Sequence, residues 1–162
     1  MRNLSDFHFG RGVKVYRGLN DTTPEQLDTS DIGPHWSKNK TSAEDWVTGI
    51  SRDNNGVPEA QIGVRNNGLL LEGRVNKKHT STPTTFEREK ETTIAKGATV
   101  RLRKIHTVRV DRPAEGVDDF NKGTVVRTKR VFKKATVGKG NSNDGQIIRR
   151  FPSDTKYPAK KE

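Results

Sequence analysis

Residues 86–104 read FEREKETTIAKGATVRLRK, and this stretch indicates β structure entered from a charged loop. The run 92–104 predicts two strands joined by a tight turn at Gly97, and in the second strand apolar and charged residues alternate. Glu89 and Glu91 lie where the loop enters the first strand. Residues two apart in an extended chain point the same way, so we expect both carboxylates to face one pocket.

The composition is that of a single small domain. Of the 162 residues, 28% are hydrophobic and 31% are charged, so the expected core is small. There is no cysteine, which excludes disulfides, thiolate nucleophiles and zinc sites built on cysteine. No apolar run reaches the roughly 18 residues of a membrane helix, and residues 1–10 lack a secretory signal. We therefore expect a cytoplasmic protein without membrane contact, or one delivered by another route, such as a virion.

Positive charge is concentrated at the carboxyl end of the chain. Residues 1–120 carry 19 Lys and Arg against 17 Asp and Glu, a net +2, whereas residues 121–162 carry 12 against 3, a net +9. With the turn-rich stretch 111–123, this predicts a core domain over 1–120 and a basic extension over 121–162, with a hairpin in 124–136. Such a segment suits nucleic acid or an acidic partner, and a solvated tail is the alternative.

The remaining patterns predict further strands and one short helix. In the segment 12–19, Val13, Val15 and the apolar part of Arg17 share one side of a half-buried strand. A helix is expected from a cap at Thr41 or Ser42, with its core stripe running from Ala43 to Ile50. Further strands are expected at 34–37, 68–75, 98–103 and 107–110. This order predicts an α+β fold with an antiparallel or mixed sheet and not a doubly wound parallel one.

Three short motifs then occur in order. They are Tyr16-Arg17-Gly18 on a strand, Trp36-Ser37 before a helix, and Phe86-x-x-Glu89-x-Glu91 before a strand. Together they resemble the three motifs of Arg-Ser-Glu class mono-ADP-ribosyltransferases. The resemblance covers residues 12–105 and implies an ADP-ribosyltransferase-like β-sandwich core, mixed or antiparallel, with few short helices.

The second motif departs from the family pattern. That motif is commonly Ser-Thr-Ser, whereas this chain has Ser37-Lys38-Asn39 and matches the first serine alone. The segment is similar to the His-Trp-Ser/Thr variant of phage-encoded and actinobacterial members. A rival assignment makes His35 the first-motif residue of the His-Tyr-Glu class, which leaves Arg17 and the paired glutamates without a role.

The resemblance implies NAD as substrate. Cleavage of the bond between nicotinamide and ribose creates an oxocarbenium-like centre, which a carboxylate stabilises more in the transition state than in the ground state. Glu91 is the residue expected to do this, with Ser37 holding it by a hydrogen bond. Arg17 is expected to grip phosphate or ribose oxygens bidentately. Gly18 and Trp36 complete the expected NAD-binding set, although a core position for Trp36 is the alternative.

The resemblance implies that the acceptor is arginine in a host or target protein, because a glutamate at the position of Glu89 goes with arginine acceptors in this family. A protonated guanidinium is a poor nucleophile, so transfer to it needs a carboxylate that orients it and takes a proton. Glu89 fits that task, and Phe86 could stack on the guanidinium. The resemblance also implies a phage or bacterial effector. Two alternatives stay open: a noncatalytic basic virion or nucleic-acid-associated protein, and transfer to nucleic acid. The four histidines have no metal-ligand spacing, so no metal is expected.

Overall fold

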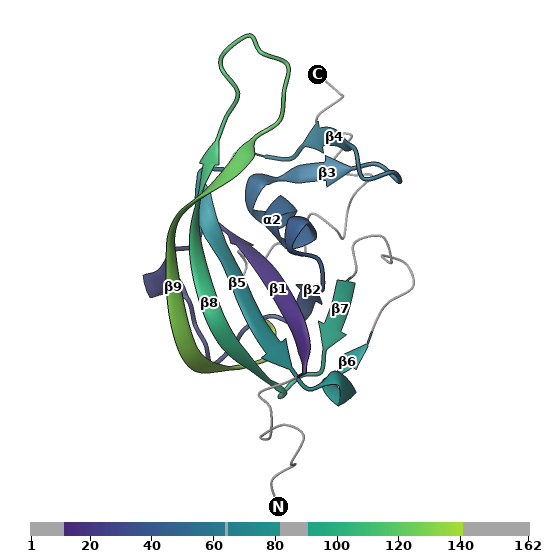
Figure 1. The fold of residues 1–162 in the computed structure, drawn as a ribbon, viewed down its shortest axis with the longest axis vertical. Coiled ribbons are helices and arrows are strands. Elements are labelled where there is room, and N and C mark those ends of the chain that lie inside the picture. Colours follow the sequence, from purple (N-terminus) through teal and green to yellow (C-terminus); the bar gives the residue numbers. More distant parts are fainter. Residues whose placement is uncertain (1–11, 64, 82–90, 141–162) are drawn as a thin grey trace, which may run out of the picture.

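The computed structural model describes residues 12–63, 65–81 and 91–140, which form a seven-stranded sheet with one α-helix beside it (Figure 1). The strand order is β6-β7-β2-β1-β5-β8-β9, and every neighbouring pair of strands is antiparallel. A second sheet contains two strands, β3 and β4. The strands are β1 (Val13–Asn20), β2 (His35–Ser37), β3 (Ile50–Arg52), β4 (Pro58–Gln61), β5 (Asn67–Val75), β6 (Thr80–Ser81), β7 (Glu91–Ile94), β8 (Thr99–Asp111) and β9 (Lys122–Thr136). The helices are α2 (Lys40–Thr48) and two 3₁₀ turns, η1 (Pro24–Gln26) and η2 (Lys77–His79).

This mainly antiparallel sheet with one helix agrees with the expected α+β class. The expected turn at Gly97 is confirmed, since this glycine has φ 87° and joins β7 to β8. Glu91 is the first residue of β7, as expected of a residue at the junction of loop and strand. Phe86 and Glu89 lie outside the described residues.

Each face of the sheet covers an apolar cluster. Odd-numbered residues of β1 and β5 point to one face, where the larger cluster lies; even-numbered residues point to the other face, which α2 covers. We call them the core face and the helix face. The core-face cluster contains Val15, Leu19, Ile32, Trp36, Leu69, Leu71, Val75, Ile94, Ala98, Val100, Leu102, Ile105, Val131, Ala135 and Val137. The helix-face cluster contains Ala43, Val47, Leu70, Val108 and Val110.

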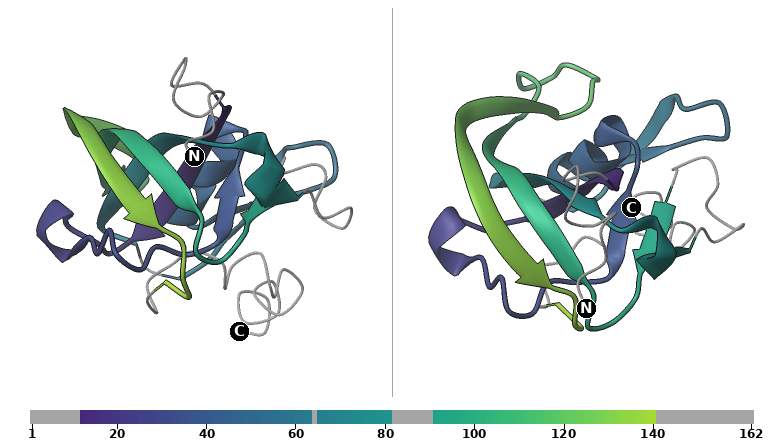
Figure 2. Two further views of the ribbon diagram at one scale, coloured as in Figure 1. Left: turned by 90° about the horizontal axis from the view of Figure 1, so that it is seen from below. Right: turned by 60° about the horizontal axis from the view of Figure 1, so that its bottom comes forward.

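The connection between β1 and β2 returns to the far edge of the sheet. Ile32 pairs in parallel with Val137, just after β9, and its amide donates to the carbonyl of Thr136 at 2.9 Å. The amide of Gly138 in turn donates to the carbonyl of Ile32 at 2.7 Å. Figure 2 shows this connection, with η1, running past the end of the strongly curved sheet. The curved sheet and this connection together enclose the core-face cluster.

The helix begins earlier than expected. Asn39, and not Thr41 or Ser42, is the cap, because its side chain accepts a hydrogen bond from the amide of Thr41 at 2.9 Å. The helix ends at Gly49, whose φ of 83° suits a left-handed cap. Ala43 and Val47 are buried as the stripe predicts, but the chain has left the helix before Ile50, which opens β3.

Two predictions about the carboxyl-terminal strands were wrong. The two strands expected at 98–103 and 107–110 are one strand, β8, whose pairing is interrupted by bulges. The expected basic hairpin is a single strand, β9, which pairs with β8 along its length and contributes Val131 and Ala135 to the core. Residues 122–137 thus share one sheet and one core with the residues before the expected boundary.

Candidate functional site

Ser37 and Glu91 lie opposite one another on neighbouring strands. In the β2–β7 pair the register joins Ser37 to Glu91, and in the β1–β2 pair it joins Ser37 to Tyr16. Residues directly opposite in an antiparallel pair point to the same face, so these three side chains form one row on the helix face. Three segments of the chain therefore meet at this row, and 53 residues lie between Ser37 and Glu91, the first residue of the strand after the charged loop.

The carboxylate of Glu91 is buried and held by an imidazole. Its side chain is 4% exposed, and Oε2 lies 2.9 Å from Nδ1 of His35. His35 is two residues before Ser37 on β2, so it points to the same face. An ionised carboxylate only accepts hydrogen bonds, so Nδ1 of His35 is the donor and the ring is held in that orientation. The contact fixes the carboxylate at the start of β7.

Ser37 is positioned by the start of the helix. Its Oγ accepts a hydrogen bond from the amide of Asn39 at 2.9 Å, and the side chain of Asn39 caps α2. One short turn thus sets both the hydroxyl of Ser37 and the first turn of the helix. The sequence departs from the Ser-Thr-Ser pattern at this turn, and the asparagine that replaces the last serine is the helix cap.

Arg17 reaches β2 from the opposite face of the sheet. It alternates with Tyr16 on β1, shares the core face with Val15 and Leu19, and is 3% exposed. Its Nη1 donates a hydrogen bond to the backbone carbonyl of His35. The sequence correctly grouped Arg17 with its apolar neighbours, but the register separates it from Ser37 and Glu91. The guanidinium therefore supports β2 from within the core and is not open to a phosphate in this structure.

Gly18 and Trp36 also have packing roles. A Cβ on Gly18 would lie 2.0 Å from the carbonyl oxygen of Ala43, so the absence of a side chain lets α2 pack directly on β1. Trp36 is 2% exposed within the core-face cluster, and its Nε1 donates to the carbonyl of Gly33 at 2.8 Å. The core position, given above as the alternative for Trp36, is the one observed. In this structure neither residue offers a surface to NAD.

A second buried carboxylate, Glu72, lies on the same face and was not predicted from the sequence. It pairs with Tyr16 across β1 and β5 and is 6% exposed. Its Oε2 lies 2.6 Å from Nε2 of His106, whose Nδ1 lies 2.7 Å from Oγ1 of Thr128. Three strands are thus linked by a hydroxyl, an imidazole and a carboxylate. The signal was present in the sequence GLLLEGRV, where a glutamate interrupts the run of a buried strand.

Charges around Glu72 keep it ionised. Burial alone raises the pKa of Glu72, but the hydrogen bond from His106 and the charges of Lys40 and Lys104 outweigh it, so the net pKa is lowered. The ammonium of Lys14 also lies 3.9 Å from one carboxylate oxygen, and that of Lys40 lies 3.8 Å from the other. Glu72 is therefore a charge-compensated anion at the centre of the sheet.

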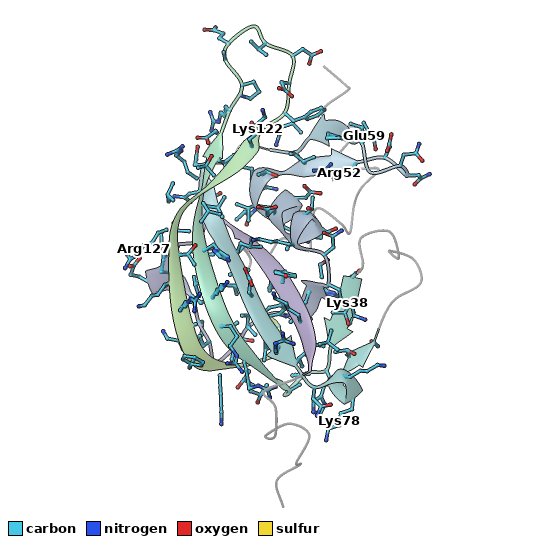
Figure 3. All side chains as sticks on the ribbon, viewed as in Figure 1. Lys38, Arg52, Glu59, Lys78, Lys122 and Arg127 are labelled. Atoms are coloured by element: carbon cyan, nitrogen blue, oxygen red, sulfur yellow. The ribbon has the colours of Figure 1, made fainter. Side chains whose placement is uncertain are left out.

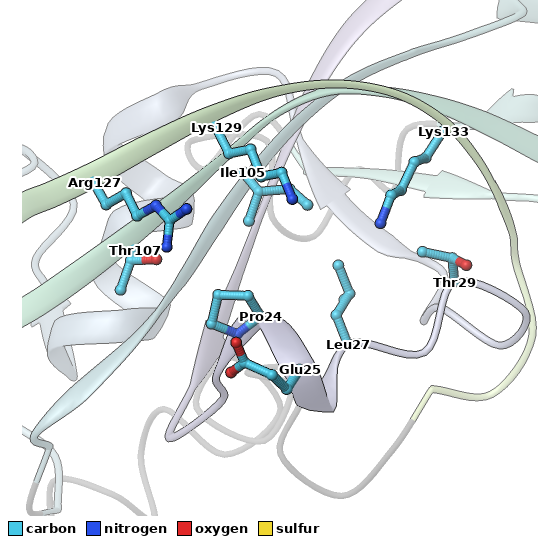
Figure 4. A pocket seen from close by; sticks show the side chains of 9 residues that line it. All are labelled: Pro24, Glu25, Leu27, Thr29, Ile105, Thr107, Arg127, Lys129 and Lys133. Atoms are coloured by element: carbon cyan, nitrogen blue, oxygen red, sulfur yellow. The ribbon is translucent and has the colours of Figure 1, made fainter.

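A cavity of about 340 Å³ lies on the core-face side of β8 and β9, away from this row (Figure 4). It includes none of the site residues predicted from the sequence. The lining residues come from the η1 connection and the two strands: Pro24, Glu25, Leu27, Thr29, Ile105, Thr107, Arg127, Lys129 and Lys133. Three cations and three apolar side chains make this an amphipathic cavity.

The described residues contain neither a metal-binding cluster nor a membrane-spanning helix. They contain no group of three or more His, Asp or Glu side chains placed to hold a metal ion. No helix among them is long and apolar enough to cross a membrane. Comparison of the whole chain with protein-family models, curated proteins and solved structures gives no match.

Proposed function

We propose that this chain is a mono-ADP-ribosyltransferase that moves ADP-ribose from NAD to an arginine side chain of a target protein and releases nicotinamide. The observation that carries the proposal is the pairing of Ser37 with Glu91 on β2 and β7. The resemblance assigns a catalytic role to both residues, although 53 residues separate them in the sequence. Their meeting on one face supports an ADP-ribosyltransferase-like arrangement of the sheet.

Glu91 has the chemistry that NAD cleavage needs. The transition state carries positive charge on the ribose, and a fixed carboxylate stabilises that charge as it develops. The hydrogen bond from Nδ1 of His35 orients the carboxylate before the substrate arrives, so little reorganisation is needed. Because Glu91 is 4% exposed, NAD must displace the groups that cover it in this structure.

The role of Arg17 differs from the expected phosphate clamp. Its contact with the carbonyl of His35 holds the strand that carries both His35 and Ser37. Arg17 is therefore a positioning residue in this proposal. Binding of the NAD phosphates then falls to groups other than Arg17.

The acceptor follows from the residues just before Glu91 in the sequence. Glu89 and Phe86 keep their expected tasks, which are to orient the acceptor guanidinium and to stack on it. The acceptor is then arginine of a host protein, as expected of a phage or bacterial effector. These two assignments rest on the resemblance, because both residues lie outside the described part of the chain.

The test measures nicotinamide release from NAD by the full chain and by two matched variants. Glu91→Gln removes the proposed catalytic carboxylate, whereas Glu72→Gln removes another buried carboxylate that also contacts an imidazole on the same face. We expect Glu91→Gln to lower the rate about 100- to 1000-fold, as when one electrostatic stabiliser of a transition state is lost. The Glu72→Gln variant should retain most activity, once unfolding curves show that both variants are folded.

The acceptor is tested with agmatine, a small guanidine, and by mass spectrometry of modified arginine in a host lysate. Absence of NAD turnover in the unmodified chain would support the noncatalytic alternative. Equal rates in the unmodified chain and Glu91→Gln would show that the carboxylate is misassigned. Modification of nucleic acid but not arginine would favour the third alternative.

A further inference from the structure

A row of four cations crosses the helix face from the centre of the sheet to its edge. Lys14 on β1 is opposite Arg74 on β5, Arg74 is opposite Arg101 on β8, and Arg101 is opposite Lys134 on β9. Strands lie about 4.8 Å apart, so the row spans about 14 Å. Like charges directly opposite one another destabilise a sheet. Part of that cost is offset, because Lys14 lies 3.9 Å from Glu72 and Arg74 donates to the carbonyl of Gly12. Four cations in one row still give this face a positive potential, which suits an anionic partner.

A second cationic row lies beside the first. Lys104 on β8 is opposite Arg130 on β9, and Glu72 of β5 continues this row toward the centre of the sheet. Glu72 is 6% exposed and already contacts His106, so it offers little charge to an incoming ligand. Arg130 and Lys134, by contrast, are exposed. We call these two rows the basic face; nitrogen-bearing side chains gather over β5, β8 and β9 in Figure 3.

An exposed aromatic ring stands among these cations. Phe132 follows Arg130 and precedes Lys134 at a spacing of two, so all three point to the helix face. Its ring is 87% exposed, and a bulge in β8 brings the guanidinium of Arg103 to 5.3 Å from the ring centroid. Exposure of a phenylalanine in water is unfavourable by about 1.5–3 kcal/mol relative to burial. A ring that is flanked by cations is suited to stacking with a base.

We infer that the basic face binds single-stranded nucleic acid, with phosphates along the two cationic rows and a base stacked on Phe132. In a duplex the bases are stacked within the helix, except at its ends. A duplex could therefore contact the cations of the basic face but could not stack a base on Phe132. An acidic peptide would likewise leave the ring without a specific role. The inference is independent of the proposed transferase activity, because it uses none of the residues assigned to NAD or to the acceptor.

Protection of a sheet edge is the competing explanation for the charges. Lysines on an edge strand prevent pairing with another chain, and β9 is such a strand. That explanation covers Lys134 and Arg130. It does not cover Arg74 and Arg101, which lie on two interior strands, whereas Lys14 on a third interior strand also contacts Glu72. Edge protection also does not explain the exposed ring of Phe132, because an exposed apolar side chain on an edge strand promotes aggregation.

The test is fluorescence anisotropy of labelled 12-nucleotide oligothymidine and oligouridine with the full chain, from 50 to 300 mM salt. The variant Arg130→Gln/Lys134→Gln removes two cations of the basic face. Its matched control, Arg127→Gln/Lys129→Gln, removes two cations from the same strand on the core-face side, where they line the cavity. Residues 141–162 are present in every variant, so their charge contributes equally.

We expect the first variant to weaken binding and to reduce the slope of log K against log salt by about 1.4, because each phosphate contact on a single strand contributes about 0.7. In the control variant, Arg127→Gln/Lys129→Gln, the slope of log K against log salt should be unchanged. Phe132→Ala should weaken binding about 5- to 100-fold at fixed salt, which corresponds to the loss of one stacked base.

Three results would overturn the inference. Equal losses in the two double variants would show attraction by charge alone, without a defined face. Unchanged affinity in Phe132→Ala would remove the stacking platform. A 12-base-pair duplex or anionic lipid vesicles bound as tightly as the oligonucleotides, with the same sensitivity to Arg130→Gln/Lys134→Gln, would identify a different occupant. Tighter binding of oligouridine would indicate RNA and tighter binding of oligothymidine would indicate DNA, and either result supports the inference.

Discussion

The two ends of the seven-stranded sheet have opposite chemistry. At the β7–β2 end, the carboxylate of Glu91 is buried against His35 and opposite Ser37. At the β8–β9 end, cations such as Lys134 and an aromatic ring, Phe132, are exposed. A group that stabilises a developing charge works best away from water, whereas a surface for a long polyanion must be open. The difference in burial therefore separates a candidate reaction site from a candidate docking surface.

The two ends depend on one another through the fold. β9 pairs with β8 from Thr99 opposite Thr136 to Asp111 opposite Lys122, and the connection before β2 pairs with the residue after β9. We therefore predict that deletion of residues 121–162 abolishes cooperative unfolding, because it exposes the core beneath β9. Circular dichroism during thermal denaturation measures this effect, which should exceed the loss of stability caused by any single substitution.

Deletion of residues 141–162 alone is the control, and the shortened chain should unfold cooperatively. A soluble and folded product of residues 1–120 that turns over NAD would contradict the prediction. It would show that the basic strand is a separate extension, as the charge distribution along the sequence first suggested.

The centre of the sheet separates the two ends and contains the ion cluster around Glu72. Glu72→Ala should lower the free energy of unfolding at pH 7 by about 3–5 kcal/mol, because His106 and nearby lysines lose a buried partner. Denaturant titration measures the change. Because β5 joins β1 to β8, we expect the loss of stability to affect both ends of the sheet equally.

The same variant has a defined pH dependence. The pKa of Glu72 is lowered in the folded state, so its contribution to stability is complete above the unfolded-state pKa of about 4.3. That contribution is lost as the pH falls through the lowered folded-state pKa. The difference between Glu72→Ala and the unmodified chain should therefore shrink below about pH 4. A difference that stays constant from pH 7 to pH 3 would contradict this account.

Gly18 links the helix to the reaction end of the sheet. Gly18→Ala should destabilise the fold by about 1–3 kcal/mol, because its Cβ would lie 2.0 Å from the carbonyl oxygen of Ala43. Displacement of α2 should also move Asn39 and Ser37, so NAD turnover should fall while affinity for oligonucleotides is unchanged. Gly123→Ala on β9 is the control, since its Cβ would meet only methyl groups, the nearest at 3.1 Å. Equal effects of the two substitutions would contradict a specific role for Gly18.

The sequence was most informative where a local pattern, such as the alternation along one strand or a glycine in a turn, is sufficient to predict the structure. Alternation in the β1 segment correctly placed Arg17 with Val15, and Gly97 marked the β7–β8 turn. The register between strands could not be predicted from the sequence, because it depends on contacts between residues that are far apart in the chain. The pairing of Ser37 with Tyr16 therefore separates Arg17 from Ser37 in a way that no local pattern reveals.

The β9 prediction failed for a related reason. Its many charges predicted an exposed hairpin, yet the burial of Val131 and Ala135 at a spacing of four is sufficient to join the strand to the core. Charged residues on both sides of a strand conceal such a sparse apolar pattern. The cationic row across β1, β5, β8 and β9 could not be predicted either, because its four members lie in four separate segments of the sequence and only the register brings them together.

The smallest predicted effect on stability is at the basic end. Phe132→Ala should change the free energy of unfolding by no more than about 1 kcal/mol, because the ring is 87% exposed and exposed side chains contribute little. The ring also contacts the half-buried Arg103, and a cation–π pair at such a solvent-exposed ring is worth about 0.5–1 kcal/mol. Val131→Ala, one residue away and buried, is the control and should cost more than the exposed ring. Denaturant titration of both variants tests the contrast. A loss above about 1.5 kcal/mol in Phe132→Ala would show that the ring serves the fold, and its exposure would then carry no argument for a ligand.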